Sequence, residues 1–223
     1  MNYLNLTKNQ LLTEIDNKSN ALINMGKQLA AISSKVEAFD IFLIVALNRT
    51  VNISKGYTTL MRENNFISAA PLIRINIDTL LRIYASIISE YDRNTYASKV
   101  MEGEQINKMK FNGTNQKLSD AFLYSELSKV QNMEWVSSIY KAGNSFIHLE
   151  KAHFYSSYQI NKNENQYLNF SIGFHDNNIP EKEKLGSSIW MNKTVDSIIE
   201  QSQIWIYEKC RKYNYDINKL NNL

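Results

Sequence analysis

The spacing of hydrophobic residues predicts helices along most of the chain. In residues 8–34, apolar side chains recur at alternating three- and four-residue steps, which places them on one face of a helix. Thr7 followed by Gln10 matches a capping box at the start of this segment, and Lys18 is the one polar interruption of its apolar stripe. We therefore expect a first helix over residues 8–34, long enough to pack along a neighbouring helix.

The following segments continue the helical pattern. Residues 36–61 are apolar on most faces at first and more polar later, as in a helix that is buried near its start. Residues 66–89 are the most apolar stretch and are expected to form the central helix, with Pro71 tolerated near its first turn. Further helices are expected over residues 91–102, 117–130, 134–149 and 187–213. The polar connection between the first two of these helices, residues 103–116, is expected to be disordered or mobile.

The hydrophobic period changes from helical to two before the last predicted helix. The alternating apolar residues are Leu168, Phe170, Ile172 and Phe174. This alternation is typical of a strand with one face on a core, and we expect its partner within residues 154–160. The expected fold is therefore mainly α: a bundle of long helices with one small antiparallel β-hairpin, at about residues 154–174, before the C-terminal helix. Since no Pro/Gly/Ser linker divides the chain, residues 1–223 are expected to form a single domain.

Composition and charge narrow the class of protein. Hydrophobic residues make up 43% of the 223 residues, with only seven Gly and two Pro, which suits one helical core. The net charge of +3 permits acidic partners, but no dense Lys/Arg run or DNA-binding motif is present. The single cysteine, Cys210, excludes an intramolecular disulfide and fits a reducing compartment. The start of the chain lacks a secretion signal, and the longest apolar run, residues 41–47, is far below the roughly 20 residues that cross a bilayer. We therefore expect a cytoplasmic protein that does not contact membranes.

The first group of candidate functional residues lies on the predicted central helix. Arg74, Asp78 and Arg82 are spaced four apart, so they project from one helix face and can pair directly. Charged groups inside so apolar a helix need partners, because burying an unpaired charge costs several kcal/mol. Two interpretations remain open: a structural ion network, or an arginine that faces a phosphate or another ligand.

The second group is a polar stripe on the predicted helix over residues 134–149. Its members are Lys141, Asn144, Ser145 and His148. The opposite side of this helix is apolar and is expected to face the core. A lysine and an imidazole on one stripe can hold a phosphate and transfer a proton without a metal or other cofactor. The competing interpretation is an ordinary solvated face.

A metal site is the third possibility. The residues of suitable type are His148, His153, His175 and Asp176. No pair of them has the tight spacing of a zinc helix or zinc knuckle. We therefore expect no metal centre and no cofactor.

Two segments carry a resemblance to a known family. The segments AAPLIRINIDTLLRIY (residues 69–84) and YKAGNSFIHLEKAHF (residues 140–154), ahead of a hairpin and a final helix, resemble the uncharacterised bacterial DUF5677-type helical proteins. In that family an R-x-x-x-E/D motif on an inner helix and a Y-x4-S-x2-H motif recur. Arg74 with Asp78 matches the first motif. The second motif matches Tyr140, Ser145 and His148.

More distantly, the pattern is similar to the HEPN helical domains of bacterial toxins and phage-defence proteins. Their metal-independent ribonucleases use an Arg, four to six residues, and then a His. Here six residues separate Lys141 from His148, so the spacing fits while the Arg is replaced by Lys. Lys does not reproduce the forked contact that Arg makes to a phosphate, so Arg74 or Arg82 would have to supply it in space.

Two functions are therefore expected. The first is a helical bundle, expected to be a homodimer, that binds a small anion or a protein partner through a polar interior site. The residues of that site are Arg74, Asp78, Arg82, Tyr140, Asn144 and Ser145. The alternative is a HEPN-like metal-independent endoribonuclease acting on RNA, with His148, Lys141 and Arg74 as catalytic residues.

Overall fold

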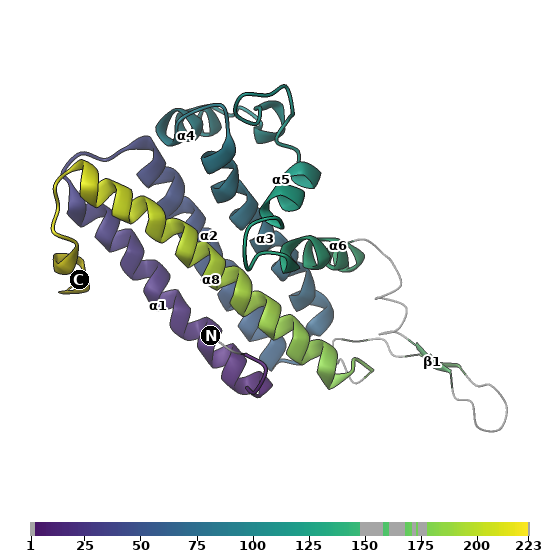
Figure 1. Ribbon diagram of the computed structural model, residues 1–223. Helices are drawn as coiled ribbons and strands as arrows, with labels where there is room; N and C mark the ends of the chain where they lie inside the picture. Colours follow the sequence, from purple (N-terminus) through teal and green to yellow (C-terminus); the bar gives the residue numbers. More distant parts are fainter. Residues whose placement is uncertain (1–2, 148–157, 161–167, 171–172, 174–177, 223) are drawn as a thin grey trace.

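The computed structural model describes residues 3–147, 158–160, 168–170, 173 and 178–222, and its core is a ring of four long helices (Figure 1). These are α1 (Lys8–Ile32), α2 (Ala38–Arg62), α3 (Phe66–Ile88) and α8 (Glu181–Lys212). Neighbouring helices are in contact in the order α1, α2, α3, α8 and back to α1, and α2 also contacts α8. The predicted mainly helical bundle is confirmed. Within the described ranges, no helix is both long and apolar enough to cross a lipid bilayer.

The shorter helices pack on one flank of this ring. They are α4 (Arg93–Met101), α5 (Asp120–Leu127) and α6 (Trp135–Ile147), with the 3-10 turn η1 (Ile106–Lys108). A second 3-10 turn, η2 (Ile217–Asn222), follows α8 and contacts α1, where Gln28 donates to the Leu220 carbonyl. In Figure 1, α5 and α6 lie beside α3, and both contact it and each other. Because α3 also contacts α2, α4 and α8, its predicted role as the central helix is confirmed.

Local sequence signals explain most helix boundaries. The Thr7 side chain and Gln10 form the predicted capping box at the start of α1. α8 begins at Glu181, earlier than the expected residue 187. Pro180 precedes its first turn, and Glu181 and Glu183 place negative charge near the positive end of the helix dipole. This start signal is absent from the hydrophobic period, which explains the error.

The connection between α4 and α5 is ordered, so the prediction of a disordered loop is wrong. The Glu90 amide donates to the Lys110 carbonyl at 2.9 Å, and an isolated antiparallel bridge joins Ser89 to Phe111. Met109, inside this polar stretch, and Leu118, two residues after it, are buried in the core. Two apolar anchors are enough to fix a segment whose average composition is polar.

Two short strands lie between α6 and α8. β1 (Tyr158–Ile160) pairs antiparallel with β2 (Leu168–Phe170), with Gln159 opposite Asn169. Most of the remaining expected hairpin, including residues 154–157 and 161–167, lies outside the described residues. The hairpin over residues 154–174 therefore stays a prediction.

Lys18, the polar interruption of the α1 stripe, meets polar partners on α8. Its ammonium lies 2.6 Å from Asp196 Oδ1 and donates to Asn192 Oδ1 at 2.9 Å. The Tyr3 hydroxyl also contacts the Asp196 carboxylate. The interruption therefore joins α1 to α8 without leaving a charge unpaired.

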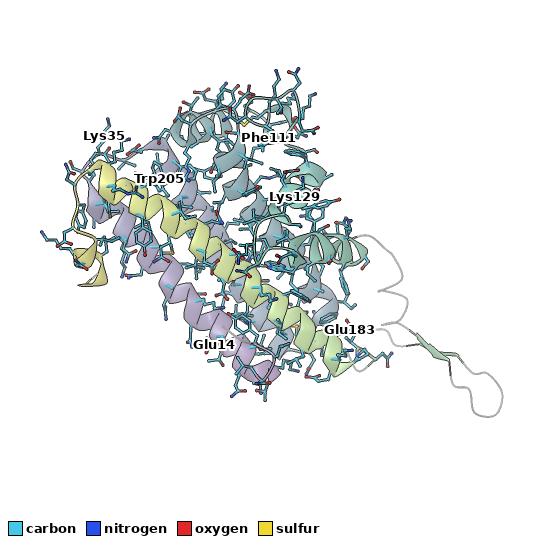
Figure 2. The ribbon with its side chains drawn as sticks, in the orientation of Figure 1. Glu14, Lys35, Phe111, Lys129, Glu183 and Trp205 are labelled. Atoms are coloured by element: carbon cyan, nitrogen blue, oxygen red, sulfur yellow. The ribbon has the colours of Figure 1, made fainter. Side chains whose placement is uncertain are left out.

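Among the residues with described positions, the most deeply buried ion pair joins α2 and α8, and it was not predicted. Lys209 Nζ lies 2.6 Å from Asp40 Oδ2, and the two side chains are only 1% and 2% exposed. Nζ also donates to the Leu29 carbonyl at 2.8 Å, and Trp205, labelled in Figure 2, donates from Nε1 to Asp40 Oδ1 at 2.8 Å. Lys209 continues the four/three spacing of Ser202 and Trp205, so the helical period already placed it on the core face.

Candidate functional site

The face of α3 that points toward α5 and α6 carries the charged ladder. Arg82 Nη2 lies 2.8 Å from Asp78 Oδ1, so the expected pairing of residues four apart is confirmed for these two. Arg74 does not repeat this pattern, because its carboxylate partner is Asp120 of α5. The ladder is partly buried on the flank of the bundle and is linked across helices.

Asp120, the first residue of α5, lies where three donor groups converge. Its Oδ1 is 2.7 Å from Arg82 Nη2, and its Oδ2 is 3.7 Å from Arg74 Nη2. The Tyr140 hydroxyl of α6 donates to Oδ2 at 3.1 Å. Sequence reasoning missed Asp120, because an aspartate in the first turn of a helix is common and no motif links it to the arginines.

Arg74 is held between α3 and α6 by an aromatic ring and an amide. Its guanidinium carbon lies 3.4 Å from the centre of the Tyr140 ring, and Nε donates to Asn144 Oδ1 at 3.3 Å. The side chain is only 11% exposed. Among the residues that the structure describes, the bond to Asn144 is its one hydrogen bond, so the terminal nitrogens have donors to spare.

A glycine makes this close approach of α6 possible. Gly143 lies directly beneath the Arg74 side chain, and a Cβ atom added there would stand 2.7 Å from Arg74 Cβ. Tyr140 and Asn144, three residues before and one after, then flank the arginine from the same helix. The small residue therefore sets the distance at which α6 supplies the ring and the amide.

The cluster keeps one positive charge in excess. Arg49 of α2 joins it, with Nη2 3.8 Å from Asp78 Oδ2. In the described part of the chain, three guanidinium groups and two carboxylates thus lie together. Burial works to lower the pKa of Arg82, but Asp78 and Asp120 outweigh it and raise that pKa above its usual value. The cluster can accept further negative charge.

The predicted polar stripe divides in the structure. Asn144 contacts Arg74, whereas the Ser145 hydroxyl donates to the Ala142 carbonyl of its own helix at 2.8 Å. Lys141 is exposed, with Nζ 5.7 Å from the centre of the Tyr124 ring. His148 lies outside the described residues. Of the sequence candidates, Arg74, Tyr140 and Asn144 are brought together directly, whereas the side chains of Lys141 and Ser145 form no hydrogen bond or ion pair with these three.

The arranged groups form a site that can bind an oxyanion. Arginine guanidinium groups and a tyrosine hydroxyl are hydrogen-bond donors that bind carboxylate or phosphate oxygens. The residues weighed as metal ligands lie outside the described residues: His148, His153, His175 and Asp176.

The Tyr140 hydroxyl gives the cluster a measurable pH dependence. Burial raises its pKa to about 12; Arg74 opposes this and Asp120 reinforces it. Because the pKa is higher in the folded state, the contribution of the Tyr140 hydroxyl to stability is complete below its unfolded-state pKa of about 10. This contribution is lost as the pH rises toward the folded-state pKa. From about pH 10 to about pH 12, we therefore expect the free energy of unfolding to fall more steeply for the wild type than for Tyr140→Phe. Urea denaturation measures both slopes, and equal slopes would show that the hydroxyl is not held as described.

Comparison with known proteins identifies no relative: no family model, no curated protein and no solved structure matches the chain. The DUF5677-type and HEPN resemblances therefore stay predictions. What the site does has to be inferred from its own geometry.

Proposed function

We propose that this protein binds a small anion, through a phosphate group, at the cluster between α3, α5 and α6. One observation carries the proposal: Arg74 is 11% exposed and fixed on the Tyr140 ring, yet its terminal nitrogens donate no hydrogen bond to a described residue. A largely buried guanidinium with unused donors favours an anion that accepts from it. The excess positive charge of the cluster supports the same ligand class.

Pyrophosphate titration by isothermal calorimetry tests the proposal. We expect the wild type to bind pyrophosphate and Arg74→Lys to bind it at least about tenfold more weakly, because lysine lacks the planar fork. Arg62→Lys is the matched control, since Arg62 pairs with Asp16 at 2.7 Å on a different helix pair. Circular dichroism establishes that each variant is folded. Absence of binding by the wild type, or equal affinity in Arg74→Lys, would reject the proposal.

We also propose that the protein forms a homodimer. Ile41, Ile44 and Val45 are exposed on one face of α2, and neighbouring exposed apolar side chains often mark a protein contact surface. Sedimentation velocity over a range of concentrations measures this directly. A monomer at every concentration would contradict the dimer and leave this face to a different protein partner.

The HEPN-like ribonuclease is the second candidate function. The contact between Arg74 and Asn144 favours it, because Asn144 precedes His148 by four residues in the sequence. In this proposal His148 acts as acid or base on a ribose 2′-hydroxyl, while Arg74 and Lys141 stabilise the charge of the phosphate. Such an activity belongs to a toxin or phage-defence system.

Incubation of the purified protein with mixed RNA in EDTA tests this candidate. We expect cleavage by the wild type, a loss of about 100-fold or more in His148→Ala, and little change in His153→Ala. EDTA removes the contribution of contaminating metal-dependent nucleases. Intact RNA, or equal cleavage by the wild type and His148→Ala, would exclude the ribonuclease.

A further inference from the structure

Asp120 occupies the point toward which the donors of the proposed anion site converge. We infer that its carboxylate is an internal anion that closes the site, and that a phosphate ligand carrying two negative charges binds by displacing it. The inference rests on the proposed anion-binding function and concerns its regulation. It follows from where the donors come from, from the exposure of Asp120, and from the charge of the cluster.

The donors and their present acceptor belong to different parts of the fold. Arg74 and Arg82 come from α3 and Tyr140 from α6, and these two helices are in extensive contact. Asp120 comes from α5, a helix of eight residues. The donors therefore stay in place if the first turn of α5 moves, while Leu123 and Leu127 keep the rest of that helix anchored in the core.

Asp120 makes only one short contact with the three donors of the proposed anion site. Its contact with Arg82 is short at 2.7 Å, whereas the Tyr140 hydroxyl is 3.1 Å away and Arg74 Nη2 is 3.7 Å away. The Asp120 side chain is 38% exposed, so solvent reaches the carboxylate, whereas Arg74 is largely covered. A carboxylate held by one short contact and open to water is easier to release than one that is enclosed.

The charge of the cluster decides between displacement and simple addition. With Asp120 in place, the three arginines and two aspartates leave one positive charge. A ligand with two negative charges added beside Asp120 would reverse that sign and repel the carboxylate. If the ligand takes the place of Asp120, the cluster becomes neutral, whereas a monocarboxylate in its place would change nothing. The charge count therefore favours a phosphate monoester, or a terminal phosphate of pyrophosphate, over a carboxylate ligand.

Neutralising Asp120 tests the competition. At constant ionic strength, we expect Asp120→Asn to bind pyrophosphate about tenfold more tightly than the wild type, because the internal competitor has lost its charge. Glu208→Gln is the matched control. It makes the same change in net charge, but Glu208 lies on α8 and pairs with Arg93 of α4. We expect Glu208→Gln to bind within about twofold of the wild type. Equal or weaker binding by Asp120→Asn would overturn the inference.

The outcomes separate this inference from the proposed function. Binding that depends on Arg74 but is no tighter in Asp120→Asn overturns the internal competitor and leaves the anion site standing. If only Asp120→Asn binds pyrophosphate, the ligand does not displace Asp120, and both displacement and anion binding by the wild type are rejected. If no protein binds pyrophosphate, both the site and its regulation are rejected.

Hydrogen exchange on the wild-type protein provides the independent measurement. If pyrophosphate displaces Asp120, we expect the amides in the first turns of α5 to exchange faster with the ligand present, while those of α6 exchange at the same rate or more slowly. Slower exchange in α5 would show that the ligand binds beside Asp120, which would overturn displacement.

Discussion

Lys209→Met is expected to lower the free energy of unfolding by about 3–5 kcal/mol, the largest effect anticipated for any single substitution here. The substitution leaves the Asp40 carboxylate buried without its cation, which lay 2.6 Å away. The Leu29 carbonyl loses its 2.8 Å donor at the same time. The hydrogen bond from Trp205 remains but does not neutralise the charge. The protein is therefore destabilised because a buried carboxylate is left without a cation.

Urea denaturation at neutral pH measures this loss. Lys129→Met is the matched control, because Lys129 pairs with Glu126 at 2.5 Å on the surface, where such pairs contribute about 1 kcal/mol or less. The double variant Lys209→Met/Asp40→Leu removes both charges and should recover much of the lost stability. A loss in Lys209→Met no larger than in Lys129→Met would contradict a buried pair.

Gly143→Ala is expected to destabilise the protein by about 1–3 kcal/mol and to weaken pyrophosphate binding. The added Cβ would stand 2.7 Å from Arg74 Cβ and 3.3 Å from its Cγ, so α6 has to move away from α3. Tyr140 and Asn144 would move with it and loosen the hold on the guanidinium. Helix propensity alone predicts the opposite sign, since alanine is favoured over glycine by about 1 kcal/mol.

Gly26→Ala is the matched control for this substitution. Gly26 lies inside α1, and a Cβ there meets no atom within 4 Å. We expect Gly26→Ala to raise the free energy of unfolding by about 0.5–1 kcal/mol in the same urea experiment. Equal effects of the two substitutions would show that α6 does not lie as close to Arg74 as described.

The sequence predicted helices well because their signals are local. The apolar period and the pair Thr7 and Gln10 located α1, and the most apolar stretch was correctly identified as the central helix α3. The start of α8 was missed because its signal is a proline followed by glutamates and not a change of period. Met109 and Leu118 show the converse, since these two buried side chains anchor a connection of polar composition.

The candidate site was predictable only within single helices. The spacing of Asp78 and Arg82 predicted their pairing, because both residues share one helix face. The contacts of Arg74 with Tyr140, Asn144 and Asp120 depend on how α5 and α6 cross α3, which no periodic pattern specifies. Gly143 was the available clue, since a glycine inside a helix often permits a close approach of another element.

Crystallisation with tungstate, a phosphate analogue with two negative charges, tests the central claim most directly. We expect an anomalous peak at the cluster, within hydrogen-bond distance of the terminal nitrogens of Arg74 and Arg82, and the Asp120 carboxylate turned away from them. Clear tungstate peaks elsewhere on the protein, with none at this cluster and Asp120 still bridging the arginines, would contradict it.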